Sequence, residues 1–194
     1  MRLSEIESAG TTVCMFRGME DRGQVGNAAL EQIAQAVGGK TFAGKDSVQA
    51  ARYYQSRPNT RLQVVGYSLG AEGVLGMQAL GPVLSITIAG WPTTLEQMAQ
   101  AVQGTWHNFF QQKELDDILA SRYKRGPYKP GGIAHSVDYG HSAIVGGVAN
   151  QVIQLIKSQG STDAGKPAGI KPQLSRADKL AQYNESQGRG KNFK

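Results

Sequence analysis

The sequence contains the stretch Leu62-Gln63-Val64-Val65-Gly66-Tyr67-Ser68-Leu69-Gly70-Ala71, in which an apolar run leads into a serine between two glycines. The apolar run predicts a buried strand, and the small residues from Ala71 onward predict a helix. A serine at such a strand-to-helix turn is strained, and its flanking glycines leave room for the neighbouring strand and helix. We interpret this G-x-S-x-G pattern as a nucleophile elbow with Ser68 as the candidate nucleophile. The alternative is an ordinary serine in a glycine-rich turn.

Strands and helices alternate along residues 1–157 of the 194-residue chain. Short apolar runs predict the strands, and apolar residues at helical spacing predict the helices between them. The expected strands are 11–16, 40–43, 62–65, 83–89, 105–110 and 133–137, and the expected helices are 27–37, one capped by Asp46 or Ser47 and ending at Gln55, 71–80, 95–102 and 142–158. This order predicts an α/β class fold, a single three-layer domain with a mainly parallel central sheet covered by helices on both sides.

Residues 158–194 are expected to form an extended or disordered basic tail, with a short helix at 175–183. From Lys157 to the end, the chain carries eight Lys or Arg and three Asp or Glu, a net charge of +5 out of the total of +6. A segment so poor in large apolar residues buries too little surface to offset the entropy of ordering it. The tail is a solubilising segment or a docking arm for an acidic partner or a larger assembly, and no pattern in it favours nucleic acid.

Composition excludes several classes of protein. The longest apolar runs are well short of the roughly 18–20 residues that span a bilayer, so no transmembrane segment is expected. The start of the chain has no apolar stretch behind Arg2, so we expect no secretory leader and a cytoplasmic location. Cys14 is the single cysteine, which excludes an internal disulfide framework and a cysteine-rich zinc site.

A serine nucleophile requires a base, and the chain has three histidines. His141 lies in a turn just before the last expected helix, where such a base belongs, and is the preferred candidate. His135 is held in reserve, and His107 lies inside an expected strand. His135, Asp138 and His141 lack the spacing of a zinc site, so we expect no metal and no cofactor.

The acid that orients the base should lie between the serine and the histidine along the chain. Asp116 has the best spacing from the end of the expected strand 105–110. Asp117, Glu114 and Asp138 also stay open as candidates. The acidic cluster could also be no more than the solvated start of a helix, where negative charge is favourable.

Two backbone N–H groups are needed for an oxyanion hole. Leu69 follows the serine and supplies one. Met19 follows Gly18 in the loop after the first strand and supplies the other. Tyr67 and Trp91, with Met19, are the candidates for lining an apolar substrate site, and Trp91 could equally belong to the core.

Three motifs carry a family resemblance: Phe16-Arg17-Gly18-Met19-Glu20, Gly66-Tyr67-Ser68-Leu69-Gly70-Ala71, and His141 ahead of the last helix. With them the chain resembles the α/β-hydrolase superfamily, and within it the small, lidless, cutinase-like serine esterases. The resemblance implies a Ser-His-Asp hydrolase that cleaves small-molecule or lipid-like carboxylic esters through an acyl-enzyme. Cutinases are secreted and disulfide-linked, whereas this chain has one cysteine. Small leaderless hydrolases of this build are also similar to phage-encoded esterases, which implies a virion-associated location.

The rival hypothesis is a non-catalytic interaction or assembly protein that uses the same fold. In that case, the basic loop 123–132, with Lys124, Arg125 and Lys129, would join the tail in a binding surface.

Overall fold

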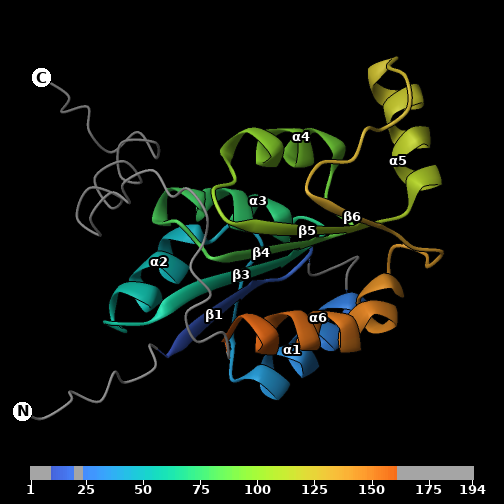
Figure 1. Ribbon diagram of the computed structural model, residues 1–194. Helices are drawn as coiled ribbons and strands as arrows, with labels where there is room; N and C mark the ends of the chain where they lie inside the picture. Colours follow the sequence, from blue (N-terminus) through green and yellow to red (C-terminus); the bar gives the residue numbers. More distant parts are fainter. Residues whose placement is uncertain (1–9, 20–23, 161–194) are drawn as a thin grey trace, which may run out of the picture.

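A computed structural model of the chain describes residues 10–19 and 24–160, and its strands form one central sheet (Figure 1). The six strands lie in the order β2-β1-β3-β4-β5-β6, and every neighbouring pair is parallel. They are β1 (Thr11–Phe16), β2 (Lys40–Phe42), β3 (Arg61–Tyr67), β4 (Leu84–Ile88), β5 (Thr105–Phe110) and β6 (Ile133–Ser136). The expected α/β class and parallel sheet are confirmed.

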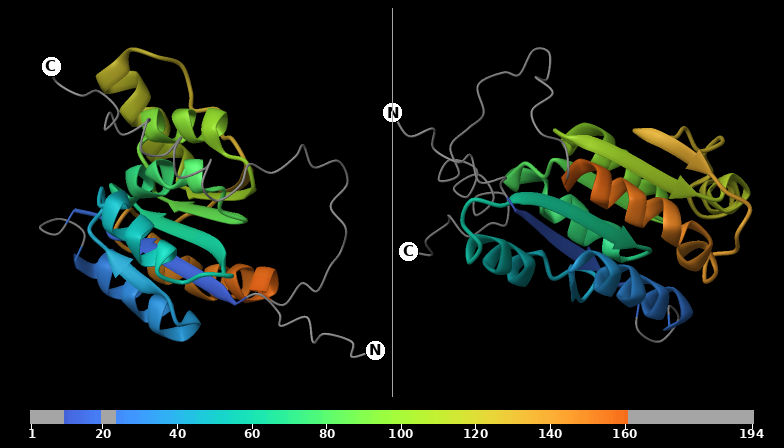
Figure 2. Two further views of the ribbon diagram at one scale, coloured as in Figure 1. Left: turned by 90° about the vertical axis from the view of Figure 1, so that its left-hand side faces the viewer. Right: turned by 60° about the horizontal axis from the view of Figure 1, so that its bottom comes forward.

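Helices cover both faces of the sheet, as Figure 2 shows from two further directions. On one face lie α1 (Gln24–Val37) and α6 (Ile144–Gly160), and on the other lie α2 (Ser47–Gln55), α3 (Gly70–Gly76) and α4 (Pro92–Ala101). A fifth helix, α5 (Gln112–Ile118), follows the carboxyl end of β5 and continues into a single π-helical turn, Leu119–Tyr123. The acidic cluster after β5 is therefore the start of a helix.

Alternation along the strands builds two separate cores. In β1, Val13 and Met15 pack on the side of α1 and α6, whereas Cys14 and Phe16 pack on the side of α2, α3 and α4. Successive side chains of a strand point to opposite faces, so a strand covered on both faces reads as a continuous apolar run. The two edge strands, β2 and β6, are less completely covered, and Ile133 of β6 is 49% exposed.

Local signals in the sequence account for most helix ends. The side chain of Asp46 accepts a 3.0 Å hydrogen bond from the N–H of Gln49 and caps α2. Gly38 follows α1 at a φ of 66°, a conformation that suits glycine. The helix expected over 71–80 is shorter than predicted. It ends at Gly76 and is followed by a 3₁₀ turn, Gln78–Leu80.

The structure describes little of the expected tail. The helix α6 continues to Gly160, three residues beyond Lys157. The rest of the tail and its expected helix at 175–183 lie outside the described residues, and the expectations for them stay predictions. Within residues 10–19 and 24–160, no helix is both long and apolar enough to cross a membrane.

Replacing Gly66 with alanine should destabilise the fold. A Cβ at this position of β3 would overlap the backbone carbonyl of Gly70 and lie 2.7 Å from Val74. Backbone cannot move aside cheaply, so we expect Gly66→Ala to lower the free energy of unfolding by about 1–3 kcal/mol, measured by urea denaturation.

Gly146→Ala is the matched control, because its Cβ would meet no atom within 4 Å on the exposed side of α6. Alanine is the better helix former, so this variant should be as stable as the wild type or slightly more stable. Equal losses in the two variants would contradict the packing argument.

Candidate active site

The turn after β3 holds Ser68 in a conformation that few side chains adopt. Ser68 has a φ of 52°, and its N–H donates a 2.8 Å hydrogen bond to the carbonyl of Ile88 at the end of β4. A Cβ at Gly70 would overlap the carbonyl of Phe16, so only glycine lets α3 begin this close to β1. The serine therefore lies at the carboxyl edge of the sheet, where open α/β sheets place their ligands.

His141 reaches this serine from a loop at the far edge of the sheet. The loop follows β6 and ends in a turn in which the N–H of Ile144 donates to the carbonyl of Gly140 over 3.0 Å. The Nε2 atom of His141 lies 2.9 Å from the Oγ atom of Ser68. This is the distance at which an imidazole takes a proton from a hydroxyl.

Glu114 completes the set from the first turn of α5. Its Oε1 atom lies 3.0 Å from the Nδ1 atom of His141, and the side chains of Glu114 and His141 are 29% and 36% exposed. With the carboxylate accepting at Nδ1, the proton of a neutral imidazole sits there and leaves Nε2 free to accept from Ser68. The three side chains form one continuous line of hydrogen bonds.

The preference for Asp116 as the acid is wrong in this structure. The Oδ1 atom of Asp116 accepts hydrogen bonds from the N–H of Tyr128 (2.7 Å) and from Nε2 of Gln112 (2.8 Å). Two residues along a helix amount to about 200° of rotation, so Asp116 and Glu114 point to different sides of α5. Asp116 thus holds the loop 123–132 against the helix. The remaining candidates for the acid, Asp117 and Asp138, are exposed.

The loop after β1, which carries one proposed oxyanion donor, approaches Ser68 at Gly18. Gly18 follows β1, the neighbour of β3 in the sheet, and its Cβ would lie 3.2 Å from the Cβ of Ser68. Met19 comes next and is 41% exposed. Leu69 precedes the first residue of α3, and N–H groups at a helix start lack partners within the helix. The role of Leu69 and Met19 as oxyanion donors stays a prediction.

Asn27 is a residue that the sequence analysis missed. Its Oδ1 atom accepts a 2.7 Å hydrogen bond from the N–H of Gly18, and its Nδ2 atom donates to the Gly18 carbonyl over 3.4 Å. The side chain therefore fixes the backbone that leads into Met19. A polar residue that falls among the buried positions of an amphipathic helix was the signal available in the sequence.

Tyr67 and Trp91, two of the candidates for lining the substrate site, differ in their exposure to solvent. Tyr67 is completely buried, so the expectation that it lines the substrate site is wrong for this structure. Strand alternation points its side chain into the core between the sheet, α1 and α6. Trp91 is partly exposed at the start of α4, and the guanidinium of Arg122 lies 5.1 Å from its ring centre. Contact between Trp91 and a substrate stays a prediction.

The other two histidines contact each other. Nδ1 of His107 lies 2.9 Å from Nε2 of His135, and the His135 ring stacks on Phe109 at 4.3 Å. Burial lowers the pKa of both imidazoles, and the pKa of His107 is lowered further by His135. His135, the reserve base, is therefore engaged with His107 on β5.

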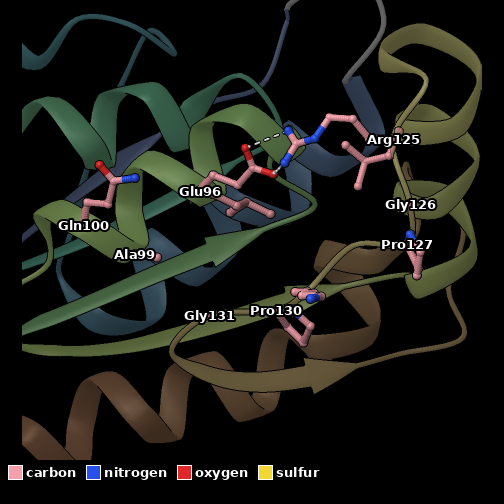
Figure 3. Close-up of a pocket in the computed structure, with 11 residues that line it drawn as sticks. Glu96, Ala99, Gln100, Arg125, Gly126, Pro127, Pro130 and Gly131 are labelled. Atoms are coloured by element: carbon pink, nitrogen blue, oxygen red, sulfur yellow. Dashed lines mark hydrogen bonds and ion pairs between the residues drawn. The ribbon is translucent and has the colours of Figure 1, made fainter.

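Two surface hollows of about 820 and 840 Å³ lie elsewhere, and Ser68, Glu114 and His141 line neither of them. Figure 3 shows the first hollow, between α4 and residues 125–131. There both carboxylate oxygens of Glu96 meet the guanidinium of Arg125, at 2.8 and 3.0 Å. Arg125, expected in a basic binding surface, thus has its charge paired.

The described residues include side chains of the types that hold metal ions, and one thiol. Among them, no three His, Cys, Asp or Glu side chains are grouped so as to hold a metal ion. Cys14 is buried, and burial raises the pKa of its thiol to about 12, which keeps it protonated.

No protein-family model matches the sequence, and no curated protein matches it either. Neither comparison therefore assigns this chain to a family.

The histidine pair should make stability depend on pH. Both pKa values are lowered in the folded protein, so the unfolded chain takes up protons first as the pH falls through about 6.5. This contribution to stability is present above that pH and is lost below it. We expect the free energy of unfolding to fall between about pH 7.5 and 5.5, measured by urea denaturation at each pH.

The variant His135→Phe keeps a ring over Phe109 and removes one titrating group. Its stability should fall less over the same interval, and some of the fall should remain because burial also acts on His107. Identical pH profiles in the two proteins would rule out this explanation.

Proposed function

We propose that this protein is a serine hydrolase of the α/β-hydrolase type that cleaves carboxylic esters through an acyl-enzyme, as the cutinase-like resemblance implies. One observation carries the proposal: the line from Ser68 Oγ through His141 to Glu114, at 2.9 and 3.0 Å, on a serine with a φ of 52°. A histidine with a purely structural role does not need a strained serine beside it.

The topology supports the same assignment. The nucleophile follows β3 in the middle of the sheet, the acid follows β5, and the base follows β6. This is the chain order serine, acid, histidine that α/β-hydrolases use. The acid is a glutamate in this proposal, which places its carboxylate one methylene further from the backbone than an aspartate would.

The mechanism follows from the geometry. Ser68 Oγ attacks the ester carbonyl carbon while His141 Nε2 takes its proton. Glu114 holds the Nδ1 proton and stabilises the imidazolium that forms. The N–H groups of Leu69 and Met19 are the proposed donors to the oxyanion. His141 then gives its proton to the leaving alcohol. Afterwards it takes a proton from a water molecule, which attacks the acyl-enzyme and releases the carboxylic acid product from Ser68.

The site is open toward solvent, because the side chains of Glu114 and His141 are each about one-third exposed. Two apolar side chains on neighbouring loops, Met19 and Tyr139, are 41% and 44% exposed. An acyl group bound beside them would lose apolar contact with water. Small-molecule or lipid-like esters are therefore the proposed substrates.

Labelling with a fluorophosphonate tests the nucleophile without a choice of substrate. We expect one adduct on Ser68, located by peptide mass mapping, because the hydroxyl is activated by His141. Neither Ser68→Ala nor His141→Ala should be labelled. A folded wild-type protein that stays unlabelled would remove the proposal and favour the non-catalytic binding protein.

Variants at two acidic positions of α5 test which carboxylate orients His141. Glu114→Gln should lower kcat for a p-nitrophenyl ester by about 10²–10⁴-fold, because the imidazole loses the partner that sets its tautomer. Asp116→Asn can still accept from the Tyr128 N–H and should keep kcat within about threefold. The opposite pattern would make Asp116 the acid.

A further inference from the structure

Tyr67 contacts the loop of the proposed base and lies under the loop of a proposed oxyanion donor. It directly precedes Ser68, and its side chain has no exposed surface. Its hydroxyl donates a 3.1 Å hydrogen bond to the carbonyl of His141, and the two ring centres lie 5.5 Å apart. One buried side chain thus contacts the base while its backbone leads into the nucleophile.

The same ring also lies under the loop of the proposed oxyanion donor. A Cβ at Gly18 would come within 2.9 Å of the Tyr67 ring, and a Cβ at Gly26 would overlap it. Backbone of the loop after β1 and of the first turn of α1 therefore rests directly on the aromatic ring. Glycine at these two positions is what allows the ring to occupy this place.

The hydroxyl of Tyr67 stays protonated at neutral pH and so can donate a hydrogen bond. Burial, with a smaller contribution from the charge of Glu114, raises the pKa of Tyr67 above its ordinary value. An ionised phenolate could not donate to a carbonyl, whereas the neutral hydroxyl can.

The loop that carries His141 needs such an anchor. At its start, the N–H of Val137 donates to the carbonyl of Phe110 over 2.9 Å, and at its end Ile144 enters the buried face of α6. Between these points, the Tyr67 hydroxyl ties the loop to the end of β3 at the base itself.

We propose that Tyr67 is a positioning residue, whose hydroxyl fixes the backbone of His141 and so sets the separation of Nε2 from the Ser68 hydroxyl. This inference rests on the proposed function. It assigns Tyr67 no contact with substrate, since the side chain is buried. Loss of the hydroxyl should therefore slow the chemical step and leave substrate binding unchanged.

The test compares two tyrosine-to-phenylalanine variants. Tyr67→Phe keeps the ring under Gly18 and removes the bond to His141. Tyr128→Phe is the matched control, because that hydroxyl is also buried and accepts a 3.1 Å hydrogen bond, here from Asn108 in the opposite core. Tyr67→Phe loses the bond to His141, and Tyr128→Phe loses hydrogen bonds with Asn108 and the Gly131 backbone, so the melting temperature of the control should fall at least as far.

Activity should separate the two variants. With a p-nitrophenyl ester, we expect Tyr67→Phe to lower kcat about tenfold or more with KM unchanged, and fluorophosphonate labelling to slow to a similar extent. Tyr128→Phe should keep both rates within about twofold. Equal losses in both variants, or a change confined to KM in Tyr67→Phe, would overturn the positioning role.

A measurement that needs no turnover separates this inference from the proposed function. Proton NMR of the wild type should show a downfield Nδ1 proton of His141 bonded to Glu114. That resonance should broaden or disappear in Tyr67→Phe and persist in Tyr128→Phe. If the wild type neither hydrolyses esters nor labels, the proposed function fails, and the resonance alone decides whether Tyr67 holds His141. An unchanged resonance in Tyr67→Phe would show that it does not.

Discussion

The site depends on how closely β1, β3 and α3 approach one another at two glycines. Side chains at Gly66 and Gly70 would overlap the carbonyls of Gly70 and Phe16. Their absence lets α3 start directly behind the serine, with the turn held by the bond from Ser68 to Ile88. A positive φ at a residue with a side chain is costly, and it persists because these backbone contacts leave no room for another conformation. The contacts of His141 with Ser68 and Glu114 require that this turn is formed.

Much of the fold could be predicted because its signals are local. Continuous apolar runs indicated the buried strands, and Asp46 and Gly38 marked helix ends that the structure also has. The turn that carries Ser68 could be predicted for the same reason, since the strand, the glycines and the helix are adjacent in sequence. His141 was identified from its place before the last helix, and the structure brings it to Ser68.

The carboxylate that contacts His141 could not be chosen from spacing. The difference between Glu114 and Asp116 is a rotation about α5, and that rotation is fixed by the contacts of Asp116 with Gln112 and Tyr128. Tyr128 is 12 residues away along the chain, in a loop that carries no periodic signal. The misassignment of Tyr67 has a related origin. Its neighbour Ser68 lies at the open edge of the sheet, but strand alternation points the Tyr67 side chain into the core. The direction of the side chain, and not its place in the motif, decides whether it can reach a substrate.

The edge position of β6 makes the contact between His141 and Ser68 sensitive to heating. This strand has one neighbour in the described sheet, is largely exposed, and leads into the loop that carries His141. Separating it from β5 breaks a single ladder and leaves the strands from β2 to β5 intact. Local openings of this kind cost less free energy than global unfolding. The proposed ester hydrolysis would then fade, reversibly, at temperatures where circular dichroism still reports a folded protein.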